Sequence, residues 1–518
     1  MNKTVFVGID AGTNGVTVAF FNAAGELLST ADEGYPCSYP HPGWVEQDMD
    51  TVWRAICTAC RRARVSAKIP DEAIGALGFS SQRGTFVVLD KTERPLAPAI
   101  VWNDSRAKEM EETIASAIGR PRFRQITGMP LSASWAVTKI AWLYRHRPAT
   151  MEPASWICNG QEYFLRLLGA ESFETDPASL TLNGMLDIRG LDWSAEVCRA
   201  AGIDMSLLPP IGRPATMVGR LSPGAATATG LPAGLTICRG AGDQQCAAVG
   251  AGVIRQGMAE ITVGTSAMMV AHLDHPDLLK GPSPYVGGHG VPGKWDLEGG
   301  AFSIGSCLEW WKRELAQAEI AEAQRLGQDP WECIMALAGG APAGAAGVIF
   351  HPFFAGQVTP YYDATARGAF LGLGLHHDRA MLIRAILEGC ACEMRLMVDA
   401  FNRDLEGGIS DLRVTGGGTK SALFTQIQAD VIGRAIGIPS ERECAVLGAA
   451  MLGAVGAGHF DSVAEAVSAM VRIERVVEPQ AGVRALYDDL YAIFVEAYER
   501  SAEAGMNARI YDFQARHF

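Results

Sequence analysis

Basic residues are in the minority, and nothing in the chain gathers them into a stripe. The 518 residues contain 44 Lys and Arg against 57 Asp and Glu, which gives a net charge of −13 and a pI of about 5.3. A surface that binds nucleic acid or anionic lipid needs concentrated positive charge. We therefore expect neither nucleic acid nor a membrane surface among the partners of this protein.

Long hydrophobic runs are also missing. The long uncharged stretch at residues 333–362 is interrupted by Gly and Pro, so it is not predicted to span a membrane. The N-terminus enters a β-branched apolar segment at once, without the basic region and apolar core of a secretory signal.

Cysteine shows no organised pattern. The twelve Cys residues are scattered, which is typical of reduced thiols in the cytoplasm rather than of a disulfide framework. Cys57 and Cys60 form a C-x-x-C, but they lie within a helical pattern and have no second pair nearby. We predict buried thiols there, without zinc or redox chemistry, and a cytoplasmic location.

The length exceeds what one hydrophobic core usually serves, so two large domains are predicted. The composition, 48 % hydrophobic and 19 % charged, is normal for a folded chain. We place the domain boundary between residues 253 and 254, giving domains 1–253 and 254–518. The sequence leaves the oligomeric state open, with a homodimer as the assembly to test.

The first distinctive segment is a predicted hairpin at residues 5–21. Two apolar, strand-like runs flank the turn Gly8-Ile9-Asp10-Ala11-Gly12-Thr13-Asn14-Gly15. Glycines let backbone N–H groups approach an anion, and Asp10 would suit a Mg²⁺ ion that accompanies phosphate. An ordinary hairpin with a Gly turn is the alternative.

A similar hairpin recurs near the middle of the chain. The strand-like run at residues 258–263 enters Gly264-Thr265-Ser266 and leaves through a second apolar run at residues 267–272. Two related halves, each with a Gly-Thr hairpin, suggest a phosphate chain held between two domains.

Polar loops follow two further strand-like segments of the first half. Gln82 and Arg83 follow a short buried strand, and polar groups in this position commonly line a site. Trp102 and Asp104 end the next strand, where Asp104 and Arg106 could equally form a local ion pair that holds the loop.

A helix is predicted from residue 134 to residue 145, beginning near Trp135. Trp142 is expected in the core, whereas Trp135 could face either the core or a sugar.

Two glycine turns precede helices elsewhere. Asp243 follows a strand and the turn at residues 239–242, and it would lie at a helix N-terminus, where the dipole favours its charged form. A simple N-cap role for Asp243 is the alternative. The triple glycine at residues 416–418 lies between a strand and a helix predicted to run through Ile436, and it would let a flat nucleotide press on the backbone.

Taken together, these motifs resemble the FGGY family of ATP-dependent carbohydrate kinases from Asp10 to about Met451. Five segments appear in the family's order: residues 8–13, 100–104, 242–245, 262–266 and 416–421. The first family signature matches residues 134–146 but departs at Ala136, and the second matches residues 368–388 but departs at Met381. The resemblance implies an α/β fold of two actin-like (ribonuclease H-like) domains, with sugar and ATP meeting in the inter-domain cleft.

The resemblance also assigns roles residue by residue. Asp243 corresponds to the catalytic base, which accepts the proton of a sugar hydroxyl. The residues implied to bind ATP are Asp10, Gly12, Thr13, Asn14, Gly264, Thr265, Gly305, Gly416, Gly417 and Ser421. Those implied to bind the substrate are Gln82, Arg83, Trp102, Asp104, Trp135 and Gln244. Asp10 and Asp243 would hold Mg²⁺.

The substrate is harder to infer. Arg83 and Gln244 match positions that glycerol kinases use for glycerol, but Gly84 and Ser134 stand where those enzymes carry Glu and Tyr. The 102–104 and 416–421 segments look more like xylulose kinases, which carry Met-His where this chain has Gln82-Arg83. We predict a kinase for a five-carbon ketose or similar polyol, with xylulose the best single candidate and glycerol or another polyol the alternative. A non-catalytic actin-like ATP-binding protein is the alternative from another class.

Overall fold

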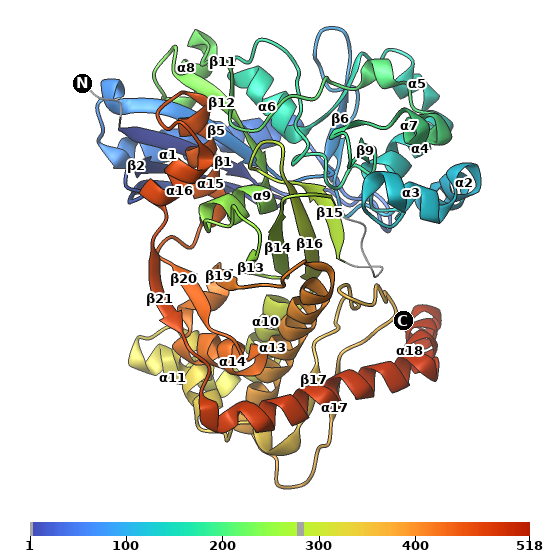
Figure 1. Cartoon of the computed structure of the whole chain (residues 1–518), viewed down its shortest axis with the longest axis vertical. Helices are drawn as coiled ribbons and strands as arrows, with labels where there is room; N and C mark the ends of the chain where they lie inside the picture. The colour runs from blue at the N-terminus through green and yellow to red at the C-terminus, as the bar shows by residue number, and fades with distance from the viewer. Residues whose placement is uncertain (1–3, 277–283, 518) are drawn as a thin grey trace.

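The computed structural model describes residues 4–276 and 284–517, and they form two stacked halves, each built on a mixed sheet (Figure 1). The first sheet has the order β11-β12-β5-β1-β2-β3. Its strands are β1 (Val5–Ala11), β2 (Gly15–Asn22), β3 (Leu27–Gly34), β5 (Ile74–Ser81), β11 (Thr216–Arg220) and β12 (Thr236–Gly242).

The second sheet has the order β15-β16-β14-β13-β19-β20-β21. Its strands are β13 (Met258–Val263), β14 (Ala267–Leu273), β15 (Tyr285–Gly288), β16 (Trp295–Ala301), β19 (Asp411–Thr415), β20 (Ile436–Pro439) and β21 (Ile473–Val477).

The two sheets repeat one pairing pattern. In the first sheet β1 pairs antiparallel with β2 and parallel with β5, and in the second β13 pairs antiparallel with β14 and parallel with β19. The tight turns of the β1–β2 and β13–β14 hairpins are the two predicted Gly-Thr segments. The prediction of two related α/β halves is confirmed.

Helices cover both faces of the first sheet. Alternate residues of β1 point to opposite faces, so Val7 packs with α1 (Met49–Ala67) while Phe6 packs with α15 (Cys444–Gly456) and α16 (Val463–Met470). The face that carries α1 also contacts α6 (Gly160–Leu168) and α8 (Pro223–Thr229).

The α15 helix belongs to the predicted C-terminal domain by sequence but packs on the sheet of the first half. It comes from the C-terminal part of the chain but packs on β1, β5 and β12, and it lies against α9 (Asp243–Gly250). Figure 1 shows α15 and α16 beside the first sheet, away from the other late helices. Small Ala and Gly residues let α15 pack closely on the sheet. The division at residues 253 and 254 stays a prediction.

A smaller lobe extends the first half. It combines the sheet β4-β7-β6-β8 with a helical cluster whose core includes Trp142, as predicted. Its elements are β4 (Glu46–Gln47), β6 (Phe86–Leu89), β7 (Ala99–Ile100), β8 (Trp156–Asn159), α2 (Lys108–Ile118), α3 (Arg120–Thr127), α4 (Ala136–His146), α5 (Pro148–Met151) and α7 (Ala195–Ala201); the pair β9 (Leu186–Asp187) and β10 (Asp192–Trp193) lies beside them.

The second half has its own helical layer around the long helix α13 (Arg379–Asp404). The others are α10 (Ile304–Leu315), α11 (Gln317–Leu326), α12 (Pro330–Gly339), α14 (Ala422–Ile432), α17 (Arg484–Glu503) and α18 (Met506–His517), with the pair β17 (Ile349–His351) and β18 (Ala369–Leu371). Within the described ranges, none of the helices has the length and apolarity needed to cross a membrane.

The N-cap of α1 is Asp48, whose side chain accepts from the Thr51 N–H. One sequence-based helix end was wrong. The helix after the triple glycine ends at Ile432, because Gly433 adopts a left-handed conformation, and Ile436 begins strand β20.

Candidate active site

An open cavity of about 740 Å³ lies in the second half. Five of the residues predicted to bind ATP line it: Gly264, Thr265, Gly305, Gly417 and Ser421. Trp331, Met335, Leu423 and Phe424 add apolar walls, which suit the faces of a planar base.

Close backbone contacts build this cavity. A Cβ on Gly305 would overlap the carbonyl oxygen of Gly264, and the Ser306 N–H donates to the Thr265 carbonyl oxygen at 3.0 Å. Gly416 adopts a φ of +78°, and a Cβ there would lie 2.7 Å from the carbonyl oxygen of Val263. Gly416 does not line the cavity itself but fixes the triple-glycine turn against the β13–β14 hairpin.

The first hairpin places Asp10 beside Asp243. The Ser80 hydroxyl donates to Asp10 Oδ1 at 2.8 Å. Burial, the charge of Asp243 and, least of the three, the charge of Glu443 together raise the pKa of Asp10 to about 7, against the lowering effect of the Ser80 hydrogen bond.

Two carboxylates that repel each other suit a divalent cation whose remaining ligands are phosphate and water. No group of three or more His, Cys, Asp or Glu side chains in the described part of the chain could hold a metal by itself. Asp10 and Asp243 therefore fit an ion that arrives with its phosphate, as Mg²⁺ does.

Hydrogen bonds connect the hairpin turn to the loops that carry the predicted substrate residues Gln82 and Trp102. Trp102 Nε1 donates to Thr13 Oγ1 at 2.9 Å, and Gln47 Nε2 donates to the Thr13 carbonyl oxygen at 2.6 Å. Gln82 Nε2 donates to Gln47 Oε1 at 2.7 Å. The Asn14 side chain is exposed at the tip of the same turn.

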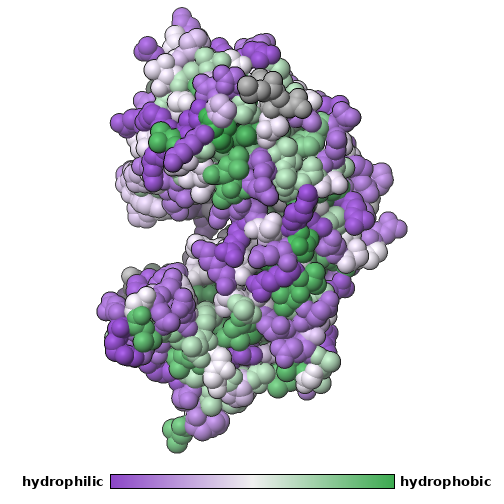
Figure 2. Space-filling view, turned by 90° about the vertical axis from the view of Figure 1, so that its left-hand side faces the viewer, coloured by the Kyte–Doolittle hydropathy of each residue, from purple (hydrophilic) through white to green (hydrophobic). Residues whose placement is uncertain are grey.

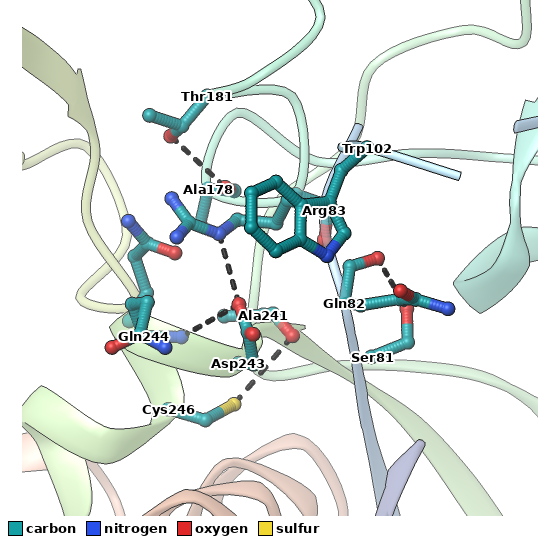
Figure 3. A network of polar contacts seen from close by, with 12 residues as sticks. Ser81, Gln82, Arg83, Trp102, Ala178, Thr181, Ala241, Asp243, Gln244 and Cys246 are labelled. Atoms are coloured by element: carbon teal, nitrogen blue, oxygen red, sulfur yellow. Dashed lines mark hydrogen bonds and ion pairs between the residues drawn. The ribbon is translucent and has the colours of Figure 1, made fainter. Parts of the chain in front are cut away.

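Two buried amide oxygens in this region have no donor. Gln82 Oε1 and Gln244 Oε1 lack hydrogen-bond partners within the described residues. Figure 3 shows these side chains on opposite sides of Asp243, with the Trp102 ring between them. Buried acceptors without donors are costly, and hydroxyl groups of a bound polyol would satisfy them.

Asp243 is the first residue of α9, and the N-cap position is occupied by Gly242. Its Oδ1 accepts from Arg83 Nε and from the Gln244 N–H, each at 2.9 Å. Oδ2 has no hydrogen-bond donor in the described chain, and the side chain is 26 % exposed. Asp243 is therefore not the N-cap of α9, and its carboxylate has one oxygen held by two donors and one without a donor in the described chain (Figure 3).

Arg83 is held from the other half of the molecule. Its Nη1 and Nη2 donate to Glu298 Oε2 and Oε1 on β16 at 2.5 and 2.7 Å, and both side chains are almost completely buried. Tyr285 and Gln245 also donate to Glu298, at 2.9 and 3.2 Å.

The remaining two predicted substrate residues point elsewhere. Asp104 is fully buried, and it accepts from the Val45 N–H at 2.6 Å and from Arg106 at 2.8 Å, which is the local ion pair considered above. The indole N–H of Trp135 donates to the Pro130 carbonyl oxygen, and its ring packs edge-on against Tyr285 in the core. As placed, neither side chain offers a free polar group to a sugar.

Sequence reasoning missed Glu298 and Tyr285. Asp296 and Glu298 alternate along β16, so both face the same side of a buried strand. Two acidic residues in such a strand are a signal of a polar site, but the partner of Glu298 lies 215 residues away in the sequence.

Family models match both halves of the chain. The model for the FGGY family of carbohydrate kinases, N-terminal domain, covers residues 5–250, and the corresponding C-terminal domain model covers residues 259–457. The chain belongs to the FGGY family of carbohydrate kinases. It is therefore a phosphotransferase that acts on an alcohol group, and the sequence-based prediction of the family and its two-domain fold is confirmed.

Relatives of this FGGY chain carry different substrate names. A glycerol kinase from Ralstonia pickettii is 31 % identical, with 91 % of this chain and 93 % of that protein covered. A gluconokinase from Bacillus subtilis is 28 % identical, with 90 % of each covered. The solved structure of a xylulose kinase from Rhodospirillum rubrum is 27 % identical with a TM-score of 0.85, covering 96 % of this chain and 99 % of that one. The comparisons leave the sugar unresolved.

Proposed function

We propose that this protein transfers the γ-phosphate of ATP to a hydroxyl of an uncharged five-carbon ketose or similar polyol, with xylulose the best single candidate. The observation that supports the proposal is the carboxylate of Asp243, in which only one of the two oxygens accepts hydrogen bonds. Its Oδ1 is fixed by two donors while Oδ2 is open, beside Asp10 and between two orphaned amide oxygens.

Each residue then has a separable task. Asp243 Oδ2 would accept the hydroxyl proton as the new O–P bond forms, and Gln82 and Gln244 would orient the sugar through its other hydroxyls. The Thr13 and Thr265 hairpins would hold the phosphates from two sides. Asp10 and Asp243 would hold Mg²⁺, which neutralises phosphate charge when bound.

Family membership favours catalysis over a non-catalytic actin-like protein. Measuring ADP release across a panel of ketoses and polyols tests the proposal directly. Release that requires one of these sugars supports it, whereas ATP consumption independent of any added sugar would sink it.

Size selection gives a sharper test. With Gly84 and Ser134 in place of Glu and Tyr, glycerol would leave polar groups unpaired, each costing roughly 1–3 kcal/mol. Two such losses lower the specificity constant for glycerol about a hundredfold or more relative to xylulose. Steady-state kinetics on glycerol, erythritol, xylulose and ribulose measure this directly.

One observation favours glycerol or another small polyol as a second candidate. Gly84 adopts a φ of +66°, and a Cβ there would lie only 2.9 Å from Leu182 Cβ and 3.4 Å from Trp102 Cβ. Neighbouring bulk thus occupies part of the space that a Glu at this position would take. If glycerol is the best of the four substrates, the size argument fails and this candidate replaces xylulose.

We also expect the two halves to close on their substrates. The Gly-Thr hairpins belong to different sheets, and the surface is indented between the halves (Figure 2). Closure would exclude water, whose attack on ATP is the competing reaction. Small-angle scattering with sugar and a non-hydrolysable ATP analogue should give a smaller radius of gyration, and an unchanged radius would count against closure.

A further inference from the structure

The guanidinium of Arg83 is the cation in contact with the carboxylate of Asp243, and it is already engaged by a second carboxylate. Arg83 Nη1 and Nη2 form a bidentate pair with Glu298 at 2.5 and 2.7 Å, while Nε donates to Asp243 at 2.9 Å. Bidentate arginine–carboxylate pairs are strong and geometrically specific. Arg83 therefore cannot turn toward a substrate carboxylate without leaving Glu298 unpaired in a buried position.

Four hydrogen-bond donors surround the carboxylate of Glu298. Oε1 accepts from Arg83 and from the Tyr285 hydroxyl, and Oε2 accepts from Arg83 and from Gln245 Nε2. Its side chain has no exposed surface. Four donors on two oxygens favour a charged carboxylate. One guanidinium therefore lies between two carboxylates, those of Asp243 and Glu298.

Neighbouring acidic groups add little negative charge to this cluster, and Lys139 is held by backbone carbonyl oxygens. Burial, and then the charge of Glu298, raise the pKa of Asp296, which disfavours its charged form. Burial keeps the pKa of Tyr285 well above its usual value, so its hydroxyl also stays neutral. Lys139 is fully buried and donates to the Val101 and Trp102 carbonyl oxygens at 2.9 and 3.0 Å.

We propose that Glu298 is a specificity-determining residue that makes the sugar pocket select uncharged polyols and ketoses against sugar acids. It acts by withholding the Arg83 guanidinium from the substrate and by leaving the pocket net negative. A buried charge that penalises the wrong ligand is a common source of specificity. The inference rests on the proposed function, and it separates the neutral substrates from the gluconate named for some relatives.

The test compares two ligands that differ only in one carboxylate. Xylitol and xylonate are measured as competitive inhibitors against the best neutral substrate, and the ratio of their inhibition constants reports discrimination against charge. Wild-type protein should bind xylonate at least tenfold more weakly than xylitol. Glu298→Gln should lower that ratio about tenfold, the size expected for one charge several ångströms away in a partly wet pocket.

The Glu298→Gln variant leaves Arg83 without its buried partner and could fail to fold for that reason. A double variant avoids this problem. Arg83→Gln combined with Glu298→Gln removes both charges, so the net charge of the cluster stays at the wild-type value. Its xylonate-to-xylitol ratio should stay within about threefold of wild type, and a tenfold fall would overturn the proposal. Glu393→Gln is the matched control, because Glu393 is a buried glutamate of α13 whose two oxygens have no partner in the described chain. It should leave the ratio unchanged.

The proposed function and the proposed role of Glu298 are contradicted by different results. If wild-type protein phosphorylates no neutral polyol or ketose, the proposed function is wrong. If it does so but binds xylonate as well as xylitol, or if a folded Glu298→Gln variant keeps the wild-type ratio, only the role of Glu298 is wrong.

Discussion

Replacing Asp243 by Asn is expected to abolish phosphoryl transfer while leaving sugar binding nearly intact. The amide preserves the size of the side chain and can still accept from Arg83 Nε and the Gln244 N–H, the two donors that fix Oδ1. It cannot accept the proton of a sugar hydroxyl at the position of Oδ2. Loss of a general base costs about 10²–10⁴-fold in rate. Turnover by a coupled ADP assay and sugar affinity by titration calorimetry measure the two effects independently.

Asp461→Asn is a suitable control, because Asp461 is exposed on the surface before α16 and lies outside the site. It should retain wild-type turnover. An Asp243→Asn variant that turned over at close to the wild-type rate would show that Asp243 only supports the start of α9. Loss of sugar affinity in parallel with rate would instead assign Asp243 to substrate binding.

The repeated hairpins could be predicted because their signal is local. An apolar run, a Gly-Thr turn and a second apolar run fix a strand, a tight turn and an antiparallel strand within about twenty residues. The structure places these segments as the β1–β2 and β13–β14 hairpins at equivalent positions of the two sheets. The end of α14 was harder to predict, because only Gly433 and Arg434 interrupt the apolar residues between α14 and β20.

The sequence predicted the part of the candidate site that is formed by residues at the ends of neighbouring strands. Asp10 lies near the carboxyl end of β1, and Gln82, Arg83 and Asp243 follow β5 and β12, which are parallel strands of the same sheet, so these residues converge at one edge. Glu298 was missed because its partner comes from the other half of the chain. The sequence also left the roles of Asp104 open, and burial against the Val45 N–H and Arg106 now favours the local ion pair.

The position of α15 on the first sheet leads to the second large expected effect, the loss of stability in Gly78→Ala. Gly78 lies in β5, where a Cβ would overlap the carbonyl oxygen of Ala449 and lie 2.9 Å from the Gly453 nitrogen, both in the backbone of α15. A helix backbone cannot yield as a side chain can, so α15 must move away from the sheet. Such overpacking costs about 1–3 kcal/mol, and occasionally more. We expect a clear fall in Tm, measured by calorimetry, and lower activity, because Glu443 precedes α15 and lies within electrostatic reach of Asp10.

Gly224→Ala provides the same substitution without the clash. Gly224 lies in α8, a Cβ there would meet nothing within 4 Å, and Ala favours a helix over Gly by about 1 kcal/mol. This variant should match or exceed the wild-type Tm. If Gly78→Ala melted at the same temperature as Gly224→Ala, the close contact between α15 and β5 would not be a stability determinant. The two halves of the chain would then be joined mainly by other contacts, such as the buried pair of Arg83 and Glu298.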